Sequence, residues 1–201
     1  MVDPNRAAIE RQAAGVHPCL RCGRRQHACR LHQPSPLGRC DADHGDRAVI
    51  WQADGEGLYD AQRGGDEPWM RGIFKSGNDG RFVVQTVLPV PYSIPMDGSV
   101  GEVMSRTGIS PMRPSHIHFL IEAKGHRRLV THLFKKSCPY IETDVVYGVK
   151  APLIAEFKLM PAGSTTPTGQ IASQAFWLLE YDFVLQPAVN ASAGAPATVA
   201  A

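Results

Sequence analysis

Short segments of alternating apolar and polar residues, separated by turn-forming residues, dominate the chain from residue 48 onwards. Glycine and proline mark most of the breaks, and no segment keeps a convincing helical period. Strands at such short spacing are typical of an all-β sandwich or barrel, which is the fold class we predict. The segments that we predict as strands are 48–51, 72–75, 81–88, 115–123, 128–134, 153–159 and 176–185.

Two of the turns predict hairpins. Asn78–Gly80 separates the second and third predicted strands, and its asparagine and glycine both accept the positive φ that tight hairpin turns require. Lys124–His126 separates the fourth and fifth predicted strands. The sequence therefore predicts that the two strands on either side of each turn pair with one another.

The two ends of the chain differ in composition from the part between them. The first 50 residues hold four of the five cysteines, four of the eight histidines and eight arginines, but no lysine, phenylalanine, tryptophan or tyrosine. Such a stretch has few large apolar groups for a core, so we expect residues 1–47 to be poorly structured. Residues 186–201 are alanine-rich and uncharged, and we expect a disordered tail. Residues 48–185 are the predicted folded domain.

An alternative for the first segment is a small zinc element. Cys19, Cys22, Cys29 and His32 form a C-x2-C-x6-C-x2-H pattern. Four such ligands at close spacing can hold tetrahedral zinc and order a chain that lacks a core. Disulfides are not expected, because we place the chain in a reducing compartment.

Charge and hydropathy exclude several classes of function. The chain has 21 basic and 19 acidic residues, and a formal charge of +2 is too balanced to indicate a nucleic-acid-binding protein. No apolar run approaches the roughly 18–20 residues of a membrane-spanning helix. The first residues lack the basic-then-apolar order of a secretory signal. We therefore expect a cytoplasmic protein with no nucleic-acid or membrane partner.

Candidate metal chemistry begins with His116 and His118. Side chains two residues apart in a strand point to one face, with Cα atoms about 6–7 Å apart, so both imidazoles can reach one metal ion. A pair of hydrogen-bonded core histidines is the alternative. Glu122 is in phase with the histidines, so HIHFLIE also resembles the first cupin motif, in which an acid completes an iron, manganese or zinc site. No second cupin motif follows it.

Tyr59 and Tyr92, each taken alone, are ordinary candidates for packed aromatic residues. Together with the histidines they form a pattern. The motifs WQADGEGLYDAQ, DGRFVVQTVLPVPYSIPMDGSVG, RPSHIHF and LVTHLF, in this order, resemble the intradiol ring-cleavage dioxygenases from about residue 48 to residue 185. The resemblance implies a β-sandwich that holds one non-haem ferric ion, Fe(3+). The ligands that it implies are Tyr59, Tyr92, His116 and His118.

The chemistry of such a site accounts for these residue types. A free tyrosine has a pKa of about 10, so its anion needs a nearby cation at neutral pH, and Fe(III) is a hard ion that favours phenolate oxygen. The resemblance implies that Tyr92 leaves the iron when a catechol-type dianion binds and takes a substrate proton as general base, while Tyr59 stays bound. It also implies that Arg113 stabilises negative charge on the ring. A structural ion pair is the alternative for Arg113.

The resemblance also bears on the substrate. His132 stands where typical catechol 1,2-dioxygenases carry glutamine, and a histidine there looks more like the hydroxyquinol (benzene-1,2,4-triol) 1,2-dioxygenases, which implies a catalytic role. Val145 and Val146 fall where the family lines the ring pocket, and small side chains leave room for a substituent. With Arg113 they are the expected substrate-binding residues. We expect O2 and a small aromatic diol or triol as partners, and favour hydroxyquinol over catechol or chlorocatechol.

The segment before residue 48 departs from the resemblance. Relatives begin with a helical segment that forms a homodimer and supplies one wall of the substrate pocket, and residues 1–47 do not resemble it. We expect a β-sandwich without that helical dimerisation domain, encoded by a truncated or frameshifted reading frame, and the oligomeric state stays open. The alternative function is a non-catalytic β-sandwich of the transthyretin-like type. It would be colourless after iron reconstitution, whereas ferric intradiol enzymes are wine-red.

Overall fold

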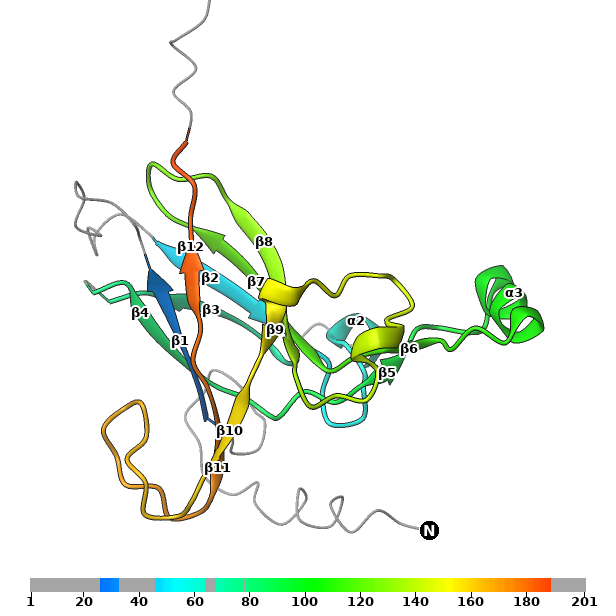
Figure 1. Cartoon of the computed structure of the whole chain (residues 1–201). Coiled ribbons are helices and arrows are strands. Elements are labelled where there is room, and N and C mark those ends of the chain that lie inside the picture. Colours follow the sequence, from blue (N-terminus) through cyan, green and yellow to red (C-terminus); the bar gives the residue numbers. More distant parts are fainter. Residues whose placement is uncertain (1–25, 33–45, 64–67, 78, 189–201) are drawn as a thin grey trace, which may run out of the picture.

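The computed structural model describes residues 26–32, 46–63, 68–77 and 79–188, the first of these ranges by its backbone alone. Within them the chain forms mostly strands (Figure 1). The strands are β1 (Gln26–His32), β2 (Arg47–Trp51), β3 (Arg71–Lys75), β4 (Arg81–Gln85), β5 (Tyr92–Ser93), β6 (Met112–Arg113), β7 (His116–Glu122), β8 (Leu129–Lys135), β9 (Ile154–Ala155), β10 (Phe157–Met160), β11 (Phe176–Leu179) and β12 (Asp182–Val184). The helical elements are α2 (Asp60–Arg63), α3 (Ser99–Thr107), η2 (Ile141–Thr143) and η3 (Ala151–Leu153).

Two sheets form the body of the molecule. The larger has five strands in the order β3-β2-β7-β8-β9, and the other has three in the order β12-β1-β4. Strands β10 and β11 form an antiparallel pair beside them (Figure 1). The predicted all-β sandwich is therefore confirmed.

The core lies between the two sheets. Ile117, Phe119 and Ile121 of β7 are at most 2% exposed and pack against side chains of the smaller sheet, among them Phe82 and Phe183. The rings of Phe119 and Phe183 lie 4.8 Å apart. Burial of a side chain of this size stabilises the fold by about 1.5–3 kcal/mol. Because the odd-numbered residues of β7 face the core, its even-numbered residues face the other side of the sheet.

One predicted hairpin is confirmed and the other is wrong. Strands β7 and β8 pair antiparallel across the Lys124–His126 turn. Strands β3 and β4 do not pair with each other: β3 pairs with β2, and β4 pairs with β1 in the other sheet. The chain still reverses its direction between β3 and β4, and the N–H of Gly77 donates to the carbonyl of Arg81 at 2.8 Å across this reversal. Turn residues determine a local reversal of the chain, whereas burial of Phe82 and Val84 places β4 in the opposite layer.

Strand β1 lies inside the segment 1–47 that we expect to be poorly structured. It pairs antiparallel with β4 and parallel with β12, so the segment contains a strand at residues 26–32, and the expectation for residues 1–47 as a whole stays a prediction. The backbone of a strand can complete a sheet even where its composition supplies few large apolar groups, because the ladder hydrogen bonds come from the main chain. Residues 1–25, 33–45 and 189–201 lie outside the described residues, as do the side chains of the zinc alternative (Cys19, Cys22, Cys29 and His32).

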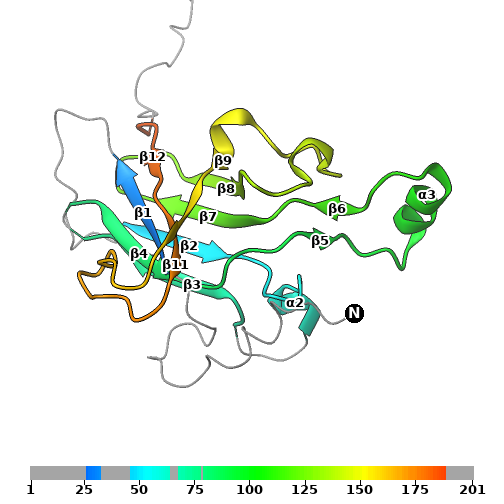
Figure 2. The ribbon, with the colours of Figure 1, turned by 60° about the horizontal axis from the view of Figure 1, so that its bottom comes forward.

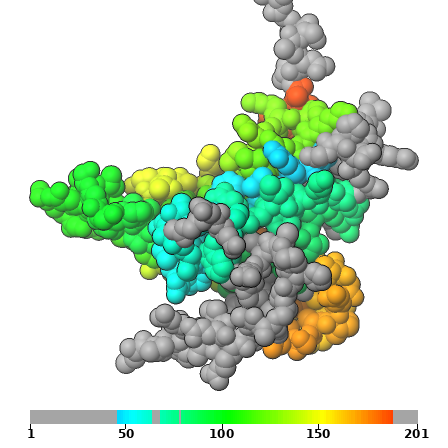
Figure 3. Space-filling model, turned by 180° about the vertical axis from the view of Figure 1, so that it is seen from behind, coloured from blue at the N-terminus to red at the C-terminus, as the bar shows by residue number. Residues whose placement is uncertain are grey.

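Helix α3 was not expected, since its nine residues show no long helical period. It buries only Gly101 and Met104, and it ends on Gly108, whose φ of 69° is left-handed. Strands β5 and β6 pair with each other and form an arm that carries α3 away from the body (Figure 2). Figure 3 shows the same helix standing out from the molecule when it is seen from behind. No helix of the described ranges is long and apolar enough to cross a membrane.

Candidate metal centre

The four side chains implied as ligands come from three separate parts of the fold. His116 and His118 lie on the face of β7 that is turned away from the core, as the alternation predicts. Tyr92 is in β5, at the base of the arm, and Tyr59 lies in the loop that joins β2 to α2. The structure brings all four together, although Tyr59 and His118 are 59 residues apart.

The polar atoms of these side chains converge on one point. The Oη of Tyr59 lies 3.2 Å from the Oη of Tyr92, 3.3 Å from the Nε2 of His116 and 3.2 Å from the Nε2 of His118. The two Nε2 atoms lie 3.0 Å from each other. Ligand atoms that are each about 2.0–2.2 Å from one ion lie about 3 Å or a little more from one another. The donor atoms of Tyr59, His116 and His118 are thus spaced like ligands of a common ion, and the Oη of Tyr92 adjoins that of Tyr59.

Several lone pairs of this cluster lie close together. The Nδ1 of His116 lies 2.6 Å from the carbonyl of Pro114, which can only accept, so Nδ1 carries the proton and Nε2 presents a lone pair. The Oη of Tyr59 has one proton for three neighbouring polar atoms. A cation at the centre of the cluster satisfies every lone pair at once.

Burial keeps both histidines neutral. It lowers the pKa of His116 to about 4 and the pKa of His118 to about 3, and the nearby Arg113 acts in the same direction on both. Neutral imidazole is the form that binds metals. Burial and the hydrogen bond with Tyr92 raise the pKa of Tyr59 well above its ordinary value. The phenolate of Tyr59 therefore needs a compensating cation, which a metal ion supplies.

Arg113 takes part in the site and in an ion pair at the same time. Its Nη1 lies 3.4 Å from the Oη of Tyr92 and 3.4 Å from the Nε2 of His116. Its Nε donates to the Oδ1 of Asp144 at 3.2 Å, and both side chains are nearly buried. Burial opposes the charge, but Asp144 and Tyr92 raise the pKa of Arg113 above its ordinary value. Arg113 can therefore form a structural ion pair and act on the site at once, because its ion pair with Asp144 holds the guanidinium beside Tyr92.

His132 lies beside the cluster without joining it. Its ring centre is 5.7 Å from that of His116 and 5.6 Å from that of His118, and its Nε2 lies 3.3 Å from the carbonyl of Gly148. A Cβ on Gly148 would lie 3.4 Å from the Nε2 of His132 and 3.4 Å from the Nη2 of Arg113. The loop that contains Gly148 therefore packs directly on both residues.

The two predicted pocket valines lie in the same loop. The N–H of Val145 donates to the carbonyl of Met112 at 3.3 Å, and its side chain is half-buried. Val146 is 50% exposed. Asp144 holds the loop by accepting hydrogen bonds from the N–H groups of Val146 and Gly148. Contact of the valines with a substrate stays a prediction.

Comparison with known proteins decides the family. The family model described as "Dioxygenase" matches residues 44–187. The chain belongs to the intradiol ring-cleavage dioxygenase family. It is 42% identical over 142 residues to the hydroxyquinol 1,2-dioxygenase of Nocardioides simplex, a match that covers 71% of this chain and 48% of that protein. It is 41% identical over 137 residues to an intradiol ring-cleavage dioxygenase of Aspergillus niger, covering 68% of this chain and 41% of the other.

A solved structure agrees with these relatives. The crystal structure of hydroxyquinol 1,2-dioxygenase from Pseudomonas putida DLL-E4 matches with a TM-score of 0.71 and 35% identity, over 81% of this chain and 56% of that one. The chain spans about half the length of the curated relatives that it matches. It thus has the fold of the part of an intradiol dioxygenase that it matches. Whether this chain shares the activity of its full-length relatives is addressed by the proposal below.

The donor set fits a hard ferric ion of the kind that is typical of intradiol dioxygenases. Two phenolic oxygens and two imidazole nitrogens converge, and phenolate is a hard anionic donor. In the described ranges no three histidine, cysteine or carboxylate side chains form a metal-binding group, and the candidate site combines two histidines with two tyrosines. The cupin interpretation is wrong, because Glu122 forms an ion pair with Arg47 at 2.5 Å at the far end of β7.

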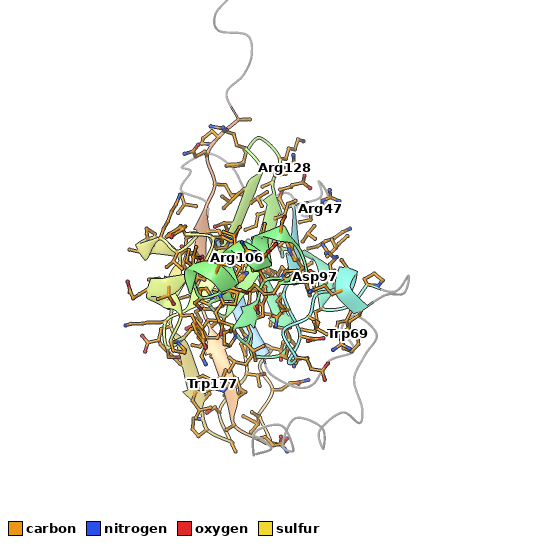
Figure 4. The ribbon with its side chains drawn as sticks, turned by 90° about the vertical axis from the view of Figure 1, so that its right-hand side faces the viewer. Arg47, Trp69, Asp97, Arg106, Arg128 and Trp177 are labelled. Atoms are coloured by element: carbon orange, nitrogen blue, oxygen red, sulfur yellow. The ribbon has the colours of Figure 1, made fainter. Side chains whose placement is uncertain are left out.

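Sequence reasoning missed Asp54, which organises the loop that carries Tyr59. Its nearly buried carboxylate accepts hydrogen bonds from the N–H groups of Glu56 and Leu58, at 2.8 and 3.1 Å, and from the indole N–H of Trp69 at 3.0 Å. Figure 4 shows Trp69 beside α2, close to this loop. Burial raises the pKa of Asp54, but these hydrogen bonds outweigh it and leave the pKa below its ordinary value. An aspartate at the start of a glycine-containing turn is the signal that could have predicted this role.

Gly57 brings this loop against Tyr92. Its φ is 83°, and a Cβ built on it would lie 2.9 Å from the Cβ of Tyr92. A side chain at this position would therefore meet both a strained backbone and a close neighbour. The sequence shows the turn, but the approach of the turn to Tyr92 appears only in the tertiary structure.

Proposed function

We propose that this protein is a ferric non-haem intradiol dioxygenase that cleaves the ring of a small aromatic diol or triol, with hydroxyquinol as its substrate. The observation that supports the proposal is that the Oη of Tyr59 and the Nε2 atoms of His116 and His118 lie 3.0–3.3 Å from one another, with the Oη of Tyr92 3.2 Å from that of Tyr59. The names of the relatives, several of them hydroxyquinol 1,2-dioxygenases, support the choice of substrate.

The overall reaction is balanced without an external reductant. The bond between the two hydroxylated carbons breaks, each of these carbons becomes a carboxyl carbon, and both atoms of O2 enter the product. The electrons that reduce O2 come from the ring itself. Fe(III), when bound, would withdraw electron density from a chelated substrate and make the ring reactive toward O2.

We assign metal binding, proton transfer and charge stabilisation to different residues of the chain. Tyr59, His116 and His118 are the proposed permanent ligands, because each contacts the others at the centre of the cluster. Tyr92 is the proposed proton acceptor at its phenolic oxygen, because Arg113, 3.4 Å from that atom, stabilises the phenolate form that can take up a proton. Arg113 is also placed to stabilise negative charge on the substrate.

We propose that His132 makes the site selective for a substrate with a third hydroxyl group. Burial lowers its pKa, so the imidazole is neutral at neutral pH and can exchange a hydrogen bond with a substrate hydroxyl. Its ring lies beside both histidine ligands, on the neighbouring strand β8. Val145 and Val146 are proposed to face the substrate ring from the loop that packs on His132.

The test uses the full chain after iron reconstitution. We expect a wine-red protein that takes up O2 with hydroxyquinol faster than with catechol or a chlorocatechol in one preparation. Tyr59→Phe and Tyr92→Phe should each change the visible charge-transfer absorption. Tyr181→Phe is the matched control, because the hydroxyl of Tyr181 donates to the carbonyl of Pro152 instead, and its spectrum should be that of the unaltered chain.

Three results would contradict the proposal. A protein that stays colourless after reconstitution and takes up no O2 would identify an inert β-sandwich. A coloured protein that prefers catechol would keep the reaction and overturn the substrate. A colour that survives in both tyrosine variants would show that neither phenol binds the iron.

A further inference from the structure

The two histidines of the proposed centre are supported in different ways. The Nδ1 of His116 is fixed by the carbonyl of Pro114 at 2.6 Å. Metal-binding histidines almost always have such a partner, which sets the tautomer and the orientation of the ring. Among the described residues no hydrogen bond reaches the Nδ1 of His118. Instead, the ring of His118 stacks on the indole of Trp51, with centres 4.8 Å apart and planes only 5° from parallel.

The other face of the indole is covered as well. The guanidinium of Arg71 lies 5.6 Å from the centre of the Trp51 ring. Asp60 holds this guanidinium with two hydrogen bonds, at 2.8 and 3.1 Å. Strand register places these groups in one row, since Arg71 is opposite Trp51 on β3 and β2, and Trp51 is opposite His118 on β2 and β7.

This row connects two of the proposed ligands. Asp60 directly follows Tyr59 in the chain, and the row runs from Asp60 through Arg71 and Trp51 to His118. A displacement of the indole would therefore change the orientation of His118 and the anchoring of the loop that carries Tyr59. An ordinary cross-strand aromatic pair stabilises a sheet without such a connection.

We propose that Trp51 is a positioning residue for His118: its stacked indole, clamped by Arg71, takes the place of the hydrogen bond that orients other metal-binding histidines. The inference rests on the metal centre described under the proposed function. It assigns Trp51 no contact with substrate or metal. Its effect is on the angle at which the Nε2 of His118 faces the other three donor atoms.

The test compares Trp51→Leu, which keeps apolar bulk, with Trp51→Phe, which keeps an aromatic ring to stack. Iron affinity is measured on the full chain by competition with a chelator, and the visible charge-transfer spectrum is recorded beside it. We expect Trp51→Leu to weaken iron binding about 10–100-fold and to shift the charge-transfer band. Trp51→Phe should restore most of the affinity and the original band.

Trp177→Leu is the matched control. Trp177 also faces a cation, the ammonium of Lys135 at 5.2 Å from its ring, and among the described residues no ring contact joins it to the four donor side chains. Figure 4 shows Trp177 on β11, apart from Trp69 and the loop of α2. We expect iron affinity and spectrum in Trp177→Leu to equal those of the unaltered chain, even if its urea midpoint falls.

A second variant keeps the proposal testable if Trp51→Leu does not fold. Arg71→Gln leaves the indole in place and removes the cation from its outer face, which should weaken iron binding about two- to fivefold. Unchanged iron affinity in both Trp51→Leu and Arg71→Gln, or in Arg71→Gln alone if only that variant folds, would overturn the inference. An unaltered chain that binds no iron would instead overturn the proposed function, so the two failures can be told apart.

Discussion

Gly57 offers a direct test of how closely the two tyrosine loops approach. In Gly57→Ala the new methyl group would lie 2.9 Å from the Cβ of Tyr92 and 3.7 Å from its Cα, so the clash is with atoms close to the backbone. The residue also has a φ of 83°, where an alanine costs about 1–2 kcal/mol. Overpacking at a rigid contact adds about 1–3 kcal/mol. We therefore expect a loss of about 2–5 kcal/mol in the free energy of unfolding.

Two other glycines separate the cost of backbone strain from the cost of the steric clash. Gly108 has a φ of 69°, and a methyl group added there would meet nothing within 4 Å, so Gly108→Ala should lose only the backbone part, about 1–2 kcal/mol. Gly55 lies in the same turn as Gly57, has no left-handed φ and has open space around it, so Gly55→Ala should be nearly neutral. Urea unfolding of the three metal-free variants gives these differences.

The spectrum of the iron-loaded protein completes the test. Because the added methyl pushes on Tyr92, only Gly57→Ala should change the tyrosinate-to-iron absorption. If Gly57→Ala lost no more stability than Gly108→Ala and kept the original spectrum, the close approach of the two loops would be wrong. A spectral change in Gly108→Ala would equally contradict the reasoning, since that residue lies at the end of the arm helix.

Three further predictions concern ligands, pH and the buried ion pair. His118→Ala should abolish iron retention, measured by metal analysis, whereas Arg113→Ala should retain the iron and lower kcat; equal behaviour of the two variants would refute this division of roles. In the metal-free chain the folded-state pKa values of His116 and His118 lie below the unfolded value of about 6.5, so unfolding takes up protons below that pH. Stability should therefore fall as the pH drops from about 6.5 to 4, by up to about 1.4 kcal/mol per pH unit for each histidine, and urea midpoints in His118→Gln should show a shallower slope. Asp144→Ala leaves the guanidinium of Arg113 buried without its partner and should lose about 3–5 kcal/mol in urea unfolding, and a loss below about 1 kcal/mol would show that the pair is solvated.

The pairing of strands shows where local patterns reach their limit. The alternation in β7 and β8 and the short turn between them predict that these strands pair, because a hairpin depends on neighbours in the chain. The turn before β4 looks equally strong in sequence, yet β4 pairs with β1 from another part of the chain. The residues of a turn determine the backbone path of about four residues. Which sheet a strand joins depends instead on where its apolar side chains can be buried in the folded core.

The site divides in the same way. The resemblance carried by the sequence motifs implied the candidate donors Tyr59, Tyr92, His116 and His118, and period-two alternation determined that both histidines leave β7 on the face opposite the core. Only the tertiary structure decided that the polar atoms of Tyr59, His116 and His118 meet within 3.3 Å of one another, that Asp144 holds Arg113 beside Tyr92, and that an indole stacks on His118. The physical reason is range: side-chain direction follows from the local backbone, whereas distances between strands and loops follow from how the whole core packs.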